Sequence, residues 1–359
     1  MFNLPAGALA LLLTSMASAC LAAPAGPGPA PAAGFGCATP HQRLDQHGFV
    51  PIGGIEQWVT VKGDDCANPI ILFVHGGPGN PLSPYSDALY GAWSKQFTLV
   101  HWDQRGAGMT YGRNKPSEAT PLSIAQLRDD GLEVAAWLGQ RYGQRKVILW
   151  GSSWGSILAV HMALQRPALF YAYLGTAQVV GYRANQAVSY PKLRQLVHEA
   201  GDVPALAILD GVGAPPWTDP RSFGKVRKII RRYEAKVTTA APAAWWTPAP
   251  LYATAQAQAD YEGGEDYAFL QFVGLRGDGM FSTVDLPSLG TQFAIPVFFV
   301  EGAQDLLATP DVAQRYFDSI EAPAKAIVVL PRAGHDPNQD VIDAQYKMLA
   351  EKILPLIER

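Results

Sequence analysis

The spacing of hydrophobic and polar residues changes along the chain, and each change marks a predicted element. Residues 55–63 alternate between apolar and polar side chains, which predicts a half-buried strand. Residues 69–76 form a continuous apolar run instead, as expected of a strand buried on both faces. Apolar residues at helical spacing predict a helix over 122–142. Strands and helices are therefore both expected in the first half of the chain.

Short apolar runs and helical segments continue to alternate on both sides of a long central interruption. Further strands are predicted at 97–103, 146–150, 170–174, 295–302 and 326–331, and further helices at 155–165, at 310–320 and up to Leu356. Strands that alternate with helices of these lengths favour an α/β fold, in which a mostly parallel sheet is covered by helices on both faces.

The interruption, residues 178–291, contains no clear strand pattern. It is rich in proline, alanine and aromatic residues, and it includes helical stretches such as residues 225–236. We therefore predict an α/β core formed by residues 37–177 and 292–359. The inserted residues 178–291 are predicted to form a mostly helical cap.

The helical stretch in the cap carries a run of basic residues. Ile229, Ile230 and Tyr233 give the same helix an apolar side, so we expect a solvated helix face rather than a patch that binds polyanions. The basic residues are Lys225, Arg227, Lys228, Arg231 and Arg232. Because the net charge of the whole chain is −3, nucleic acid is also a poor candidate partner.

The N-terminus has the features of an exported protein. Residues 1–19 hold an apolar run too short to span a membrane, followed by a small-residue cleavage pattern, so we predict a signal peptide. Cys20 follows directly and leaves lipidation open, although plain secretion is favoured. Residues 20–36 are rich in proline and alanine and predict an extended linker. We expect a periplasmic or secreted protein, which contacts a membrane only if Cys20 carries a lipid.

Cys37 and Cys66 remain if Cys20 is removed or modified. Two thiols in an exported protein are candidates for a disulfide, which would link the N-terminal segment to the first strands. Two free thiols are the alternative, because the sequence does not give the distance between them.

Residues 147–159, VILWGSSWGSILA, place two adjacent serines between glycines after a predicted strand. Residues 151–155 fit the pattern G-x-S-x-G with Ser153 at its centre. This spacing lets a strand turn sharply into a helix and exposes the central side chain, because small residues stand where the backbones approach. Ser153 is therefore a candidate nucleophile. A plain strand–helix turn capped by Ser153 is the alternative.

A serine nucleophile needs a base that takes its proton and an acid that orients the base. In an α/β protein these groups are expected after later strands, in the chain order serine, acid, histidine. Asp305 follows the first strand predicted after the cap, and His335 follows the next one. Glu301 is the rival acid. Asp336 is adjacent to His335 in the chain and is poorly placed to orient it.

Attack on a carbonyl also requires donors for the oxyanion that develops. The backbone N–H of Trp154, directly after Ser153, is one candidate. Residues 75–79, HGGPG, follow an early predicted strand, and glycine there allows a backbone N–H to face a substrate oxygen. We assign Gly77 as the second donor, ahead of Gly76. A glycine-rich turn without a ligand role is the alternative.

Three motifs occur together in this chain. HGGPG at 75–79, DQRGAG at 103–108 and GSSWGS at 151–156 resemble the α/β-hydrolase-fold prolyl aminopeptidase (proline iminopeptidase) family of serine peptidases. The resemblance extends over about residues 55–174 and from residue 295 to the end. It implies an α/β-hydrolase fold with a cap over the site.

The resemblance also implies the roles of the site residues. Ser153 would be the nucleophile, His335 the base and Asp305 its orienter, with Gly77 and Trp154 as oxyanion donors. The expected enzyme is a serine-type hydrolase that releases N-terminal residues, proline favoured, from short peptides through an acyl-enzyme. No metal or organic cofactor is implied, because no cluster of histidine, cysteine and aspartate has ligand spacing.

In that family, acidic cap residues bind the free amino group of the substrate, and an apolar pocket holds the proline ring. The densest acidic patch of the cap is EGGED at 262–266, which makes Glu262, Glu265 and Asp266 the candidates; a solvated turn is the alternative. The cap lacks recognisable family motifs, so the substrate, a short peptide or an ester, is left open. An esterase or broader amide hydrolase with the same triad and a catalytically silent binding protein are the rival functions. No feature indicates an oligomeric state.

Overall fold

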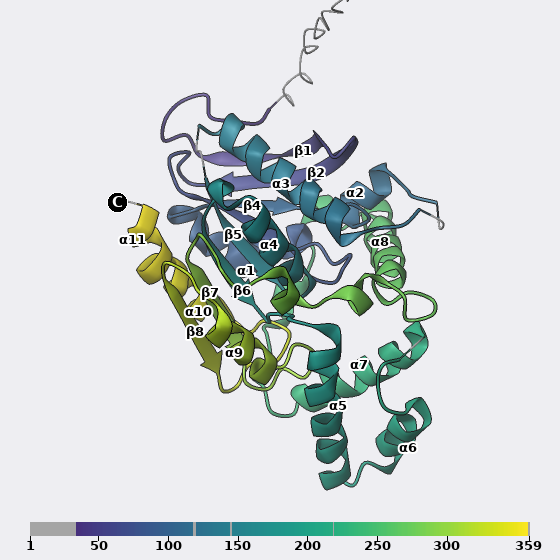
Figure 1. Ribbon diagram of the computed structural model, residues 1–359. Helices are drawn as coiled ribbons and strands as arrows, with labels where there is room; N and C mark the ends of the chain where they lie inside the picture. The colour runs from purple at the N-terminus through teal and green to yellow at the C-terminus, as the bar shows by residue number, and fades with distance from the viewer. Residues whose placement is uncertain (1–33, 118–119, 144–145, 218, 358–359) are drawn as a thin grey trace, which may run out of the picture. The chain divides into compact units, whose positions relative to one another are not determined.

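The computed structural model describes residues 34–117, 120–143, 146–217 and 219–357 (Figure 1). The predicted signal peptide, Cys20 and most of the predicted linker lie outside the described residues. All the elements below belong to the unit that begins at Ala32. Within the described ranges, no helix is both long enough and apolar enough to cross a membrane.

Eight strands of the described chain form one sheet in the order β1-β2-β4-β3-β5-β6-β7-β8. The strands are β1 (Leu44–Ile52), β2 (Ile55–Gly63), β3 (Ile70–Val74), β4 (Thr98–Trp102), β5 (Val147–Ser152), β6 (Phe170–Thr176), β7 (Val297–Gly302) and β8 (Lys325–Leu330). β2 pairs antiparallel with β1 and β4, and every other pairing is parallel. The mostly parallel sheet predicted from the sequence is confirmed. β1 was not predicted, because Gly48 and Pro51 interrupt its pattern.

Helices cover both faces of the sheet (Figure 1). One face carries α3 (Ile124–Arg141), α4 (Trp154–Gln165) and α9 (Pro310–Ser319), and the other carries α1 (Ser86–Tyr90), α10 (Gln339–Met348) and, after a π-helical turn (Leu349–Ile353), α11 (Leu354–Ile357). Side chains of a strand alternate between the two faces: Leu72 and Val74 of β3 pack with the first set of helices, and Ile71 and Phe73 with the second. The continuous apolar runs in the sequence therefore reflect burial on both sides.

Between β6 and β7 the described chain is largely helical. Its α-helices are α5 (Tyr182–Glu199), α6 (Val203–Val212), α7 (Pro220–Glu234) and α8 (Ala255–Val273). α5, α6 and α7 share an apolar cluster of their own, which includes Leu193, Leu209 and Ile230. We call this helical segment the cap. Since its cluster is separate from the two clusters on the sheet, the cap is a second layer of packing added to the core.

Helix α8 of the cap packs against the core, where its neighbours are α2 (Gly108–Arg113) and the HGGPG loop. A Cβ on Gly79 would lie 2.8 Å from Cβ of Ala268, and a Cβ on Gly264 would lie 3.1 Å from the carbonyl oxygen of Gly106. Contacts this close tolerate no added methyl group without a shift of the backbone. Glycines on both sides therefore allow α8 to lie directly on the loop.

Cys37 and Cys66 form a disulfide. Their Cα atoms lie 6.1 Å apart, within the range that a disulfide spans. The bond joins the segment before β1 to the turn after β2, and it closes a loop with a sequence separation of 29 residues. The cross-link thus ties the N-terminal segment to the antiparallel edge of the sheet.

In the turn from β5 into α4, a helix approaches the sheet very closely. A Cβ on Gly155 would overlap the carbonyl oxygen of Val74 in β3. A Cβ on Gly151 would lie 2.8 Å from Cβ of Ala159. The two outer glycines of the G-x-S-x-G pattern therefore have a steric role, since they allow α4 to begin directly over β3.

We expect Gly155→Ala to destabilise the protein strongly, because the added methyl group meets a backbone carbonyl that cannot move alone. The predicted loss in the free energy of unfolding is about 3 kcal/mol or more. Gly211→Ala in α6 is the matched control, because nothing lies within 4 Å of the added Cβ. That control is expected to gain about 0.5–1 kcal/mol. Urea unfolding of the two variants measures the difference, and equal stabilities would contradict the steric account.

Candidate active site

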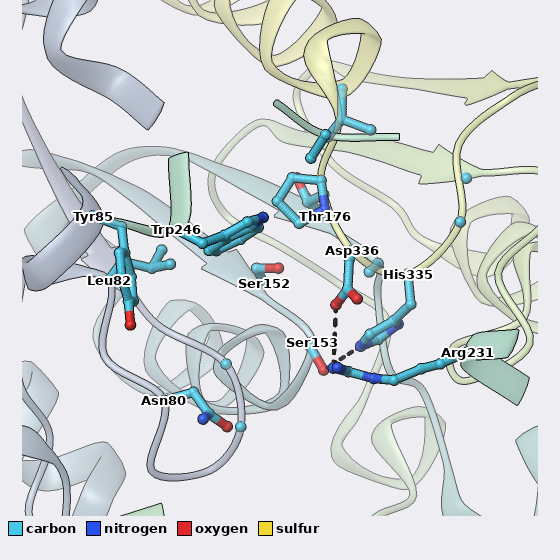
Figure 2. A pocket seen from close by; sticks show the side chains of 18 of the residues that line it. Asn80, Leu82, Tyr85, Ser152, Ser153, Thr176, Arg231, Trp246, His335 and Asp336 are labelled. Carbon is cyan, nitrogen blue, oxygen red and sulfur yellow. Dashed lines mark hydrogen bonds and ion pairs between the residues drawn. The ribbon is translucent and has the colours of Figure 1, made fainter. Parts of the chain in front are cut away.

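Ser153 occupies the turn between β5 and α4 in a strained conformation, with φ 52° and ψ −121°. A positive φ outside glycine costs about 1–3 kcal/mol and persists only where the surroundings impose it. Here the N–H of Ser153 donates to the carbonyl of Thr176 at 3.1 Å, and its carbonyl accepts from the N–H of Ser156 at 2.9 Å. The hydroxyl of Ser153 caps no N–H of α4. The side chain is left to project toward His335 (Figure 2).

His335 and Asp305 complete a chain of hydrogen bonds that begins at Ser153. His335 Nε2 lies 2.9 Å from Ser153 Oγ, and its Nδ1 lies 2.8 Å from Asp305 Oδ2. Asp305 is fully buried, and its Oδ1 accepts the N–H groups of Leu307 and Ala308, each at 2.7 Å. These two bonds fix the carboxylate. An Nδ1–H donated to Asp305 leaves Nε2 free to accept the proton of the serine hydroxyl.

The two rival acids lie elsewhere. Glu301 is fully buried, and both of its oxygens accept the N–H of Gln178, at 3.2 and 3.1 Å. Burial raises the pKa of Glu301 well above its usual value. Asp336 forms an ion pair with Arg231 (Figure 2), in which Arg231 Nη2 and Asp336 Oδ1 are 3.3 Å apart. Of the described acids, it is Asp305 and not Glu301 or Asp336 that forms a hydrogen bond with the imidazole of His335.

The environment of His335 shifts its protonation. Burial acts to lower the pKa of His335, but the charge and hydrogen bond of Asp305, followed by the charge of Glu234, act in the opposite direction and prevail. The net result is a pKa raised above the usual value of 6.5. A stronger base is thereby placed beside Ser153.

The HGGPG loop lies over Ser153. A Cβ on Gly76 would be 3.2 Å from Cβ of Ser153. Gly77 has φ +114° and lines both cavities that reach Ser153. Within the described residues, neither the N–H of Gly77 nor that of Trp154 is taken by a protein acceptor. Both candidate donors therefore remain available to a substrate oxygen at Ser153.

Gln104, in the second sequence motif, holds this loop against the turn. Its side-chain Nε2 donates to the carbonyl of His75 at 2.9 Å, and its Oε1 accepts Nε1–H of Trp154 at 3.2 Å. The backbone N–H of Gln104 donates to Nε2 of His75 at 3.2 Å. Burial lowers the pKa of His75 to about 4, so the ring is neutral and can accept this bond. The sequence motif thus connects the two proposed sources of oxyanion donors.

Two cavities meet at Ser153. The larger has a volume of about 670 Å³ and a wall of mixed polarity, which includes Tyr85, Trp246 and Glu265. The smaller has a volume of about 60 Å³ and is largely apolar. Its aromatic residues are Trp154, Trp217, Phe223, Phe272 and Phe281. In the described part of the chain, no group of three or more histidine, cysteine, aspartate or glutamate side chains is arranged to hold a metal ion.

The three acidic candidates of the cap occupy different places. Glu265 is partly buried and lines the larger cavity, and among the described residues its carboxylate has no hydrogen bond or ion pair. Glu262 is exposed and lines, with Glu265, an adjacent cavity of about 440 Å³. Asp266 is exposed and lines neither cavity at Ser153. The structure therefore brings only Glu265 of the three to the cavity of Ser153.

Glu234, the last residue of α7, reaches the site although the sequence did not single it out. Its Oε1 accepts the N–H of Leu306 at 2.7 Å, and its Oε2 accepts the N–H of His335 at 3.3 Å. Burial, together with the charge of Asp305, raises the pKa of Glu234 to about 7. Its position four residues after Ile230, on the apolar side of a predicted helix, is the signal that could have identified it.

Arg227 departs from the solvated helix face expected for the basic run. Lys225, Lys228, Arg231 and Arg232 are exposed, but Arg227 is partly buried and lines both cavities at Ser153. The expectation is therefore wrong for Arg227. The residue lies beside Val226, four residues after Phe223 and three before Ile230, so helical spacing places it on the apolar side of α7.

Comparison with known proteins identifies the family of this chain. Residues 71–345 match the model of the α/β hydrolase family. The probable aminopeptidase YbaC of Bacillus subtilis is 30% identical over 298 residues, which cover 80% of this chain and 89% of that protein. The probable proline iminopeptidase of Streptomyces coelicolor is 26% identical over 305 residues, which cover 81% of this chain and 90% of that protein. The proline iminopeptidase structure from Mycobacterium smegmatis superposes with a TM-score of 0.59 at 19% identity, over 87% of this chain and 98% of the other; this likeness concerns the fold.

We expect Ser153 to react with a fluorophosphonate reagent, because His335 is placed to accept its proton. Ser153→Ala should abolish labelling, and Asp305→Asn should slow it by about a hundredfold or more. Ser152→Ala is the matched control, since Ser152 lines the same cavity but the hydrogen bond to His335 comes from Ser153. Intact-protein mass spectrometry over time measures the rates. Unchanged labelling of Ser153→Ala would show that another residue is the nucleophile.

Proposed function

The chain belongs to the α/β hydrolase family, among its prolyl aminopeptidase-like members, and we propose that it is a serine aminopeptidase that releases N-terminal residues, proline favoured, from short peptides. Its relatives support a peptidase-like hydrolase activity. The observation that carries the finer proposal is the hydrogen-bond chain from Ser153 through His335 to Asp305 at the floor of a cavity.

The proposed reaction begins when Ser153 Oγ attacks the carbonyl carbon of the first residue of the peptide. His335 Nε2 accepts the hydroxyl proton as the new C–O bond forms, and Asp305 holds the imidazolium that results. His335 then gives this proton to the leaving amine, and the C–N bond breaks. Water, deprotonated by His335, attacks the acyl-enzyme, and the proton returns to Ser153 as the amino acid leaves.

The carbonyl oxygen becomes an oxyanion during each attack. The N–H groups of Gly77 and Trp154 are proposed to donate hydrogen bonds to it, because both are free within the described residues and both flank Ser153. Gln104 supports this arrangement from behind, through the carbonyl of His75 and the indole of Trp154. A donor pair held by fixed backbone needs little reorganisation as the charge develops.

The two cavities suggest how the first residue is recognised. The carboxylate of Glu265, which has no partner among the described residues, supports binding of a free, protonated amino group in the larger cavity. The small apolar pocket, with Phe223, Phe272 and Phe281 in its wall, suits a compact apolar ring such as that of proline. Together they favour a substrate with a free N-terminus and a small apolar first side chain.

We expect proline p-nitroanilide to be hydrolysed faster than its N-acetylated form, because acetylation removes the charge that Glu265 would bind. Glu265→Gln should lower kcat/KM for the free substrate about 10- to 100-fold, the range of a charge-assisted hydrogen bond. Asp266→Asn, an exposed acid one position away, is the control and should retain activity. Equal turnover of free and blocked substrates would favour a broader amide hydrolase, and turnover of p-nitrophenyl esters alone would favour an esterase.

The dependence of kcat/KM on pH should report His335. Its pKa is raised from 6.5, and only the neutral ring accepts the serine proton, so the rate should rise with pH through a midpoint above that value. Glu234→Gln removes a charge that helps to raise this pKa, and should move the midpoint to lower pH. Glu262→Gln, which removes an exposed charge, should leave the midpoint in place. A rate that is flat across this range would argue against His335 as the base.

A further inference from the structure

Arg227 is the one side chain with a permanent charge among the described residues that line the small apolar pocket. It also lines the larger cavity, so the residue borders both. Phe223, Val226 and Ile230 of the same helix face form the apolar wall around it. The position of Arg227 on α7 therefore brings a cation to the space beside Ser153.

Within the described ranges, no carboxylate is paired with this cation. Arg227 makes no hydrogen bond and no ion pair there, although Glu265 and Asp336 are near enough to influence it. Asp336 is already paired with Arg231, at 3.3 Å. Burial, and then the charge of Arg231, lower the pKa of Arg227, because both disfavour the charged form. A partly buried guanidinium without a partner is unfavourable unless an anion completes the site.

The chemistry of a short peptide supplies such an anion. In a dipeptide the carboxylate carbon is two bonds from the scissile nitrogen, just as the α-amine is two bonds from the scissile carbonyl carbon. A cavity that binds both ends of a dipeptide must therefore present an anionic and a cationic side chain near the same nucleophile. Glu265 and Arg227 line one cavity with Ser153, and the planar guanidinium matches a carboxylate through two parallel hydrogen bonds.

We propose that Arg227 binds the terminal carboxylate of the substrate, so that the preferred substrates are dipeptides rather than the N-termini of longer chains. This inference rests on the proposed aminopeptidase function and narrows its substrate class. The amine lies at Glu265, the first side chain occupies the apolar pocket, and the carboxylate of the leaving residue lies at Arg227. Longer peptides would place a neutral amide at Arg227 and would leave its charge unpaired.

The test compares the dipeptide Pro-Ala with its C-terminal amide, using the full chain. Wild type should hydrolyse the free acid with a kcat/KM about tenfold or more above that of the amide. Arg227→Gln should bring this ratio close to one, and Arg227→Lys should restore part of it. Lys228→Gln, an exposed cation on the same helix, should keep the wild-type ratio. A ratio of one in wild type, or a ratio retained in Arg227→Gln, would overturn the inference.

Proline p-nitroanilide separates failure of this inference from failure of the proposed function, because the anilide carries no carboxylate. Anilide turnover by wild type without a preference for the free acid refutes the role of Arg227 and leaves the aminopeptidase standing. Hydrolysis of neither the anilide nor the dipeptides by wild type refutes both. The acid-to-amide ratio is taken within each variant, so a partial loss of folded protein in Arg227→Gln cancels. If Arg227→Gln shows no measurable turnover, Arg227→Lys takes its place: a ratio below that of wild type supports the inference, because the second hydrogen bond of the guanidinium is lost, and an unchanged ratio refutes it.

Discussion

The site depends on the steric contact between helix α4 and strand β3, where Gly155 faces the carbonyl oxygen of Val74. Because no side chain stands between them, the helix begins directly over the strand, and Ser153 is forced into a conformation with φ 52°. That conformation turns the serine hydroxyl away from the N–H groups of α4 and toward His335. The same turn leaves the N–H of Trp154 beside the hydroxyl, without an acceptor in the part of the chain that the structure describes. One close backbone approach thus positions both a candidate nucleophile and a candidate oxyanion donor.

The cap is connected to this chemistry through Glu234. A carboxylate at the C-terminal end of a helix is unfavourable, because it faces the negative end of the helix dipole. Here it is retained in a buried position, where it accepts backbone N–H groups of Leu306 and His335 from the two loops that carry Asp305 and His335. Those donors would be left unsatisfied without it. The position of α7 and the geometry of the hydrogen-bond chain are therefore linked, and the same helix presents Arg227 to the cavities.

Local sequence was sufficient for the parts of the site that lie at strand ends. Ser153 stands in a motif whose spacing has a steric cause, and Asp305 and His335 follow predicted strands in the expected order; the structure brings the three within hydrogen-bond distance. Glu234 and Arg227 were not found in this way, because their roles depend on how a cap helix lies over the core, which no local pattern encodes. Their positions on the apolar side of a helix were visible, but the density of charge nearby favoured a solvated face.

The central claim is that Ser153 forms a covalent acyl-enzyme. The most direct measurement is to quench the reaction with acid during turnover of an activated proline ester and to map the peptides by mass spectrometry. With an activated ester, hydrolysis of the acyl-enzyme rather than its formation is expected to limit the rate, so the acyl-enzyme should accumulate. The account predicts a prolyl group on the peptide that contains Ser153, with Ser153→Ala both unmodified and inactive. Steady turnover by wild type without an adduct on this peptide, together with a Ser153→Ala variant that turns over as fast as wild type, would contradict it.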